Sequence, residues 1–227
     1  MTARSPHRGT PATARSTPAT VHPVPYHAQW ASPELVEAIV EGSLDAAEDP
    51  LWRAYGAESP GEYAWWSWRL CGVACLRMAL EYWRGSAPTA MELARECLAA
   101  GAYVRREDGL DGLIYAPFAS YAEERWGLKA VARPHLPLAE LRRLIEAGHL
   151  ALLSVHPSIR GLGPAPERRG GHLVLAVGAD EDALVFHNPS GFKGRSQEFV
   201  SVGWGDLERF YAGRGVVLGP GTGRPER

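Results

Sequence analysis

The chain of 227 residues lacks any long apolar run and any surplus of charge of one sign. No stretch approaches the roughly 20 consecutive apolar residues that a helix needs to cross a bilayer. Its 24 basic and 26 acidic residues leave a formal net charge of −2. That balance predicts neither nucleic acid nor an anionic membrane as partner. The sequence does not indicate an oligomeric state.

Cysteine is scarce, and the few thiols point to a reducing compartment. Cys71, Cys75 and Cys97 cannot all pair, and residues 1–20 lack the apolar segment of a secretory signal. Reduced thiols in a cytoplasm fit both observations. Zinc takes four ligands, and Cys71 with Cys75 has no matching second pair in the chain. We therefore expect no metal and no cofactor.

Length and composition predict one domain with short tails. Apolar residues make up 45% of the chain, enough for a sizeable core. We expect a flexible N-terminal tail over residues 1–21, one domain over 22–219, and a flexible C-terminal tail over 220–227.

Helical patterns fill the first half of that domain, and strand patterns fill the second. Apolar spacing and caps predict helices over 32–42 (capped by Ser32), 71–83, a helix opened by the capping box of Thr89 and Glu92, and helices within 113–126 and over 138–147. Residues 45–68 are aromatic and predicted irregular. Strands are expected over 150–155, 172–177, 183–187, 197–202 and 216–218, with a short helix capped by Asp206. The result is an α+β fold, a helical N-terminal half packed against an antiparallel β-sheet.

Cys71 stands at the mouth of the predicted 71–83 helix. The partial positive charge and free N–H groups of a first helical turn favour thiolate over thiol. Because the thiolate is the nucleophile, Cys71 is a candidate catalytic residue. The alternative is a buried structural thiol, since free cysteine is among the most buried residue types. Cys75, one turn further along, is expected in the core.

His172 and Asn188 are the candidate base and orienting residue. Gly170 and Gly171 precede His172, which begins an apolar strand, and Asn188 ends the strand expected to pair with it. A side-chain oxygen that accepts from one imidazole nitrogen aims the other nitrogen at the sulfur. A turn is the other explanation for Asn188-Pro189. His156 and His187 are the other candidates for the base.

Four segments together resemble the papain-like cysteine peptidases that cut double-glycine leader peptides, the bacteriocin-processing type, in their stand-alone form. They are Val24 to Gln29, the helix from Cys71-Gly72 to Tyr82-Trp83, the Gly170, His172 and Gly178 strand, and the Asn188-Pro189 turn. The resemblance implies a papain-like cysteine peptidase fold, with Cys71 as nucleophile, His172 as base, Asn188 as orienting residue and Gln29 as oxyanion donor. Val73 replaces the proline usual after Cys-Gly, and the stretch from Gln29 to Cys71 is long for this family.

These observations favour a thiol hydrolase that cleaves an amide or peptide bond through a Cys acyl-enzyme, acting on a peptide or an amide-containing small molecule. Two alternatives stay open. An amine in place of water would make the same site an amide-forming acyltransferase or ligase, with the tryptophans of 45–68 as a lid that excludes water. A binding module on an inactive peptidase fold would use those aromatics as its surface, unless they only pack a connection onto the core.

Overall fold

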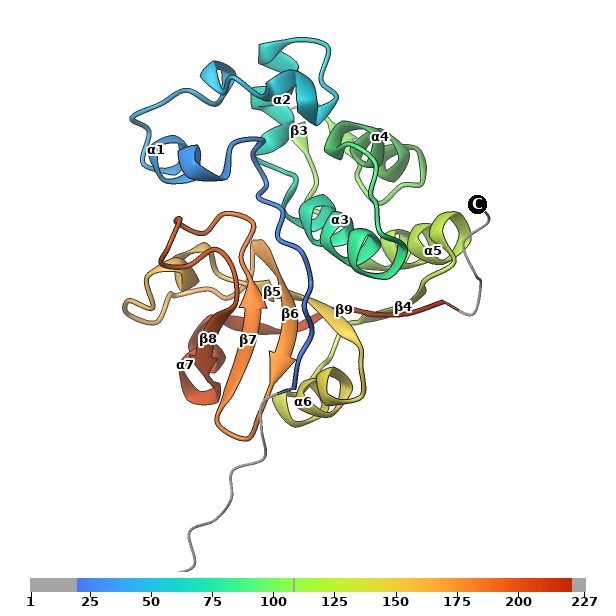
Figure 1. Cartoon of the computed structure of the whole chain (residues 1–227), viewed down its shortest axis with the longest axis vertical. Coiled ribbons are helices and arrows are strands. Elements are labelled where there is room, and N and C mark those ends of the chain that lie inside the picture. The colour runs from blue at the N-terminus through green and yellow to red at the C-terminus, as the bar shows by residue number, and fades with distance from the viewer. Residues whose placement is uncertain (1–19, 108, 222–227) are drawn as a thin grey trace, which may run out of the picture.

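The structure, a computed structural model, describes residues 20–107 and 109–221 (Figure 1). The expected tails, residues 1–21 and 220–227, lie mostly outside these ranges. Thr20 and Val21 are described, and they form a short strand, β1 (Thr20–Val21), paired antiparallel with β6 (His172–Ala179). These two residues therefore join the sheet.

The described residues form seven α-helices, five of them before residue 127. They are α1 (Val36–Val40), α2 (Pro60–Ser67), α3 (Cys71–Arg84), α4 (Ala90–Ala99), α5 (Tyr115–Trp126), α6 (Leu138–Glu146) and α7 (Trp204–Phe210). Short 3-10 turns cover Pro33–Leu35, Ala46–Glu48, Trp52–Tyr55 and Pro157–Arg160. In Figure 1 the helices α1 to α5 lie together above the sheet.

The main sheet is antiparallel throughout and has the strand order β4-β9-β5-β6-β7-β8, with β1 on β6. Its remaining strands are β4 (Lys129–Arg133), β5 (Leu150–Val155), β7 (Ala183–His187), β8 (Val200–Gly203) and β9 (Tyr211–Gly219). A separate two-stranded ribbon joins β2 (Arg105–Arg106) to β3 (Gly109–Leu110). The α+β prediction, helices first and an antiparallel sheet second, is confirmed.

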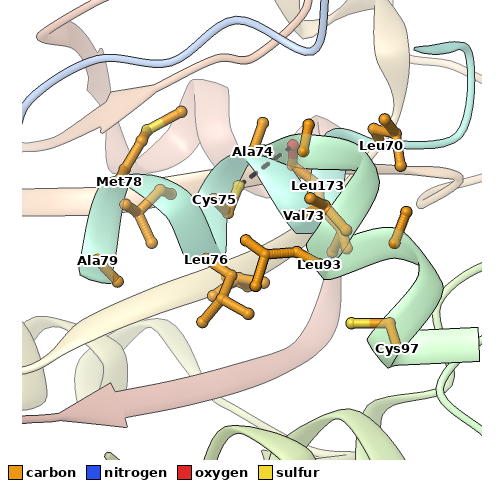
Figure 2. Packing of buried hydrophobic residues seen from close by; sticks show 14 of the residues in the cluster. Leu70, Val73, Ala74, Cys75, Leu76, Met78, Ala79, Leu93, Cys97 and Leu173 are labelled. Atoms are coloured by element: carbon orange, nitrogen blue, oxygen red, sulfur yellow. Dashed lines mark hydrogen bonds between the residues drawn. The ribbon is translucent and has the colours of Figure 1, made fainter. Parts of the chain in front are cut away.

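Alternation along the strands divides the core between the two faces of the sheet. Leu150 and Leu152 of β5 join the cluster that contains α3 and α4. Ala151 and Leu153 join a second cluster, which contains α6 and α7. Figure 2 shows the first cluster where α3 and α4 pack together. The helical half therefore covers one face of the sheet, while α6 and α7 cover the other.

Local signals placed α3 and α4 correctly. Apolar residues recur along α3 at helical spacing, and the helix ends at Gly85, whose φ of +78° suits a residue without a side chain. The capping box is present: the Thr89 side chain accepts from the backbone N–H of Glu92, and Glu92 accepts in return from that of Thr89.

The aromatic segment 45–68 is more ordered than the sequence predicts. It contains α2, and its Tyr63 and Trp66 are buried in the cluster around α3. Asp49 anchors the segment, because its fully buried carboxylate accepts from the N–H and Oγ of Ser32 and from the Tyr63 hydroxyl. The Ser32 side chain therefore bonds to Asp49 and does not cap the following helix, contrary to the prediction.

Other predictions also needed correction. The strand expected over 197–202 is β8 and begins at Val200, and Gly203 precedes α7, so Asp206 lies inside that helix and does not cap it. Residues 129–133 form the edge strand β4, which the sequence analysis did not predict, and β9 begins at Tyr211, well before residue 216. Both strands pair with partners distant in sequence, so no local turn motif predicts them. Among the described residues, no helix is both long and apolar enough to span a bilayer.

Candidate active site

A cavity of about 460 Å³ opens between the helical half and the sheet. From the helical half it is lined by Trp68, Arg69, Cys71, Tyr103, residues 110–113 and Tyr115. From the sheet it is lined by Ser154, Gly171, His172, Leu173 and Arg214. Cys71 begins α3 and His172 begins β6, so the ends of two elements about a hundred residues apart in sequence meet at this cavity.

Cys71 is partly exposed, whereas Cys75 and Cys97 are buried. Burial of the thiol raises the pKa of Cys71, and the backbone N–H groups of Leu173, Gly72 and Cys71 itself oppose that rise. The Leu173 N–H belongs to the peptide bond that follows His172, so the sulfur lies beside the start of β6. The free N–H groups of the helix start do favour the thiolate, as the sequence predicts, but burial outweighs them.

Gly72 lets the helix start approach the sheet closely. A Cβ at this position would lie 2.6 Å from Cδ2 of Leu113 and 3.0 Å from Cδ1 of Leu173. Leu113 and Leu173 both line the cavity. The glycine after Cys71 is therefore explained by packing, because it brings Cys71 against the strand that carries His172.

His172 and Asn188 are hydrogen-bonded and buried. The Nε2 atom of His172 lies 2.8 Å from Oδ1 of Asn188, and the two residues are 6% and 0% exposed. The backbone N–H of Ser190 donates to the same Oδ1 at 3.1 Å, which fixes the oxygen of the amide toward the imidazole. Nε2 therefore carries the proton, and Nδ1 is left as the basic nitrogen.

Ser190 and Arg160 complete this arrangement, and the sequence analysis did not identify either. The Oγ of Ser190 lies 3.0 Å from Nε2 of His172. The Arg160 guanidinium donates from Nε to the backbone oxygen of Ser190 at 2.7 Å and from Nη2 to its Oγ at 2.8 Å. The one signal for Ser190 was its place two residues after the candidate Asn188. Nothing local marks Arg160, which lies 30 residues from Ser190.

The electrostatic surroundings favour the neutral imidazole. Burial lowers the pKa of His172 to about 4; the hydrogen bond to Asn188 opposes this shift, and the Arg160 charge adds to it. Together with the raised pKa of Cys71, this favours a neutral thiol and a neutral imidazole at pH 7. A thiol and an imidazole in these states carry no resting ion pair, and thiolate forms only when the imidazole takes the proton.

Gln29 lies near this turn, outside the cavity lining. Its backbone N–H donates to the oxygen of Pro189 at 2.8 Å, and the residue is 4% exposed. Its Oε1 is buried without a hydrogen-bond partner among the described residues. The structure therefore brings Gln29 to the Asn188-Pro189 turn, and its oxyanion role stays a prediction.

The other candidate histidines and Cys75 have structural roles. His187 uses both ring nitrogens, with Nε2 2.9 Å from the Val24 oxygen and Nδ1 accepting from the Phe199 N–H. His156 caps a 3-10 turn by accepting from the Ser158 N–H. Figure 2 shows Cys75 among apolar side chains, with its thiol 3.9 Å from the backbone oxygen of Leu173.

Comparison with known protein families gives one match. Residues 60–215 match the sequence profile of the family described as Peptidase_C39 like. No curated protein sequence matches the chain.

Several solved structures are similar to this chain, including those of three proteins. One is a Bacillus anthracis protein described as a C39-like peptidase, with TM-score 0.48 and 19% identity over 70% of this chain and 90% of that one. Another is the peptidase domain of Streptococcus ComA, with TM-score 0.46 and 12% identity over 67% and 92%. The third is a double-glycine motif protease from an AMS/PCAT transporter, solved with its leader peptide, with TM-score 0.43 and 18% identity over 66% and 84%.

The family match spans more than half of the chain and contains Cys71, His172 and Asn188. It does not include Gln29, and the Trp-rich segment lies only partly within it. The chain therefore belongs to the C39-like peptidase family, among the papain-like cysteine peptidases that its sequence resembles.

Proposed function

We propose that this protein is a thiol peptidase that cleaves an amide bond through an acyl-enzyme on Cys71. One observation carries the proposal. Cys71 and His172 line one cavity, while Asn188 holds Nε2 of His172 at 2.8 Å and leaves Nδ1 free to act as the base. Nucleophile, base and orienting group are the parts that such a reaction needs.

In the first half-reaction, the Cys71 sulfur adds to the substrate carbonyl carbon while its proton passes to Nδ1 of His172. The Cys71 N–H and the Gln29 side chain stabilise the oxyanion. The C–N bond then breaks as the imidazolium donates its proton to the leaving amine. Water next attacks the thioester and gives a proton to His172; the carboxylic acid leaves and the thiol is restored.

The substrate is a peptide or an amide-containing small molecule. Peptides with a Gly-Gly sequence are the first class to test, because the resemblance is to peptidases that cut double-glycine leader peptides. Trp68 offers an apolar contact, since it lines the cavity and remains 50% exposed. Formation of an amide from the same thioester is the alternative reaction. Its motivation is weaker, because most of the aromatic segment packs into the core.

The test is cleavage of a mixed panel of synthetic peptides, including Gly-Gly peptides, read by mass spectrometry. We expect new termini with the wild-type protein and none with Cys71→Ala. Cys97→Ala is the matched control, because it removes a buried thiol outside the cavity lining. Equal cleavage by Cys71→Ala would overturn the assignment. Repeating the assay with added amines detects amide products, and a stable fold without any turnover would favour the binding module.

A further inference from the structure

The cavity beside Cys71 carries more positive than negative charge. Arg69 and Arg214 line it, and among the described residues that line it Asp111 is the only carboxylate. That carboxylate is already bound, because Oδ2 of Asp111 accepts from Arg106 Nε at 2.9 Å and from Nη2 at 2.6 Å. Two arginines therefore line a cavity whose one acid among the described residues is already paired with Arg106.

Arg214 of β9 is exposed and takes part in none of the ion pairs formed by the described residues. Its Nη2 lies 3.1 Å from the position that a Cβ of Gly170 would take, and Oγ of Ser154 lies 3.0 Å from the same position. Gly170 and Gly171 have φ values of +97° and +93°, which suit glycine alone. A side chain at Gly170 would meet both Ser154 and Arg214, so this glycine leaves room for the Arg214 guanidinium.

Arg69 approaches from the helical half, two residues before Cys71. It donates from Nη1 to the backbone oxygen of Trp65, and its guanidinium stacks 4.3 Å from the centre of the Trp65 ring. It too takes part in no ion pair among the described residues. The stacking fixes the position of the guanidinium of this lining residue without neutralising its charge.

We infer that the substrate of this site carries a carboxylate near the bond that is cleaved, bound by the Arg214 guanidinium with Arg69 adding to the positive field. Guanidinium groups bind carboxylates with paired, charge-assisted hydrogen bonds. A cleft lined by one sign of charge also concentrates ligands of the opposite sign. The inference rests on the proposed function for the identity of the scissile bond, but the positive field can be measured without turnover.

The first experiment compares alkylation of Cys71 by iodoacetate and iodoacetamide, which differ by a carboxylate against an amide. The rate constant for iodoacetate is divided by that for iodoacetamide, and this ratio is normalised to the same ratio for a small neutral thiol. Both are measured at about pH 8, where His172 is neutral and adds no charge. At low salt we expect a normalised ratio of about three or more, falling as salt is added. Arg214→Gln should bring it toward one. Arg143→Gln, which removes an exposed cation of α6 on the other side of the sheet, should not.

A wild-type ratio of one or below, or equal ratios in Arg214→Gln and Arg143→Gln, would overturn the inference. This result is independent of hydrolysis. If the peptide panel is not cleaved, the proposed function fails while the alkylation ratio still decides whether the cavity favours a carboxylate.

The second experiment identifies the source of the carboxylate in a cleaved peptide. Glu replaces Gln at each position flanking the scissile bond, and a C-terminal acid replaces the amide. We expect about a tenfold higher kcat/KM for the acid at one of these places. Arg214→Gln should abolish this preference, and Arg214→Glu should favour Lys there. A Glu preference assigns a side-chain carboxylate, and a C-terminal preference assigns the chain end. No preference for any acid would contradict the inference.

Discussion

Arg160 holds Ser190 through two hydrogen bonds, from Nε to the backbone oxygen at 2.7 Å and from Nη2 to Oγ at 2.8 Å. Through Ser190 this guanidinium reaches both Asn188 and His172. It is half-buried and lies close enough to lower the pKa of His172. Arg160 is thus linked to the proposed base by hydrogen bonds and by charge.

We expect Arg160→Met to lower kcat/KM about tenfold, because two charge-assisted hydrogen bonds to Ser190 are lost. The acidic limb of the pH profile should also move to higher pH, because the cation no longer lowers the pKa of His172. Arg160→Lys should slow the reaction while leaving that limb in place. Arg195→Met is the matched control, since Arg195 also stacks on Phe192 but pairs with Glu37. An unmoved acidic limb in Arg160→Met would contradict the charge coupling.

Asn188→Ala should lower kcat by about 10²-fold, with a smaller change in KM, because the imidazole loses the acceptor that fixes its tautomer. Asn188→Asp keeps an acceptor and adds a negative charge 2.8 Å from Nε2. That charge should raise the pKa of His172 and move the acidic limb upward. Steady-state kinetics from about pH 3 to 8 measure both effects. A full kcat in Asn188→Ala would remove Asn188 from the proposed machinery.

Without substrate, Cys71 should titrate as a hindered thiol, because burial raises its pKa. We expect its alkylation by iodoacetamide to rise with pH through a midpoint above the ordinary value of about 8.5. Site-resolved mass spectrometry separates Cys71 from Cys75 and Cys97. Fast labelling that is already constant near about pH 5 would instead reveal a thiolate–imidazolium pair at rest.

Stability should fall as the solution becomes acidic. His172 has a pKa of about 4 in the folded state, lowered from 6.5, so the unfolded chain binds the proton first as pH falls. The free energy of unfolding should therefore decrease from about pH 6.5 to 4, by up to about 3 kcal/mol from this residue alone. Urea titrations at several pH values measure the slope. It should flatten in His172→Gln but not in the exposed His135→Gln. Equal slopes in both variants would argue against a buried neutral His172.

Gly72→Ala should destabilise the protein by about 1 kcal/mol and slow cleavage, since the new methyl group must displace Leu113 and Leu173 at the cavity wall. Gly61→Ala is the control, because its Cβ meets nothing within 4 Å in α2. That variant should be as stable as the wild type or more so. Thermal unfolding compares the two. A stabilised Gly72→Ala would mean that the close approach at Cys71 is not tight.

The sequence by itself determined the helix that begins at Cys71, the capping box of α4, the change from helices to strands, and the order of Cys71, His172 and Asn188. Periodicity, caps and strand alternation are local, so a single chain displays them without its fold. The order of the aromatic segment 45–68 could not be predicted in this way. Asp49 holds the segment through hydrogen bonds to Ser32 and Tyr63, and no local sequence pattern encodes these contacts.

Only the tertiary structure decided which side chains meet around these residues. The Arg160–Ser190 bonds, the exposed Arg214 beside Gly170, and the balance between burial and N–H groups at Cys71 depend on segments up to about a hundred residues apart. A guanidinium is paired or unpaired, and a thiol buried or open, only once the strands have set their register. The order of the proposed catalytic residues can therefore be read from the sequence, whereas their protonation states and the charge of the cavity depend on tertiary packing.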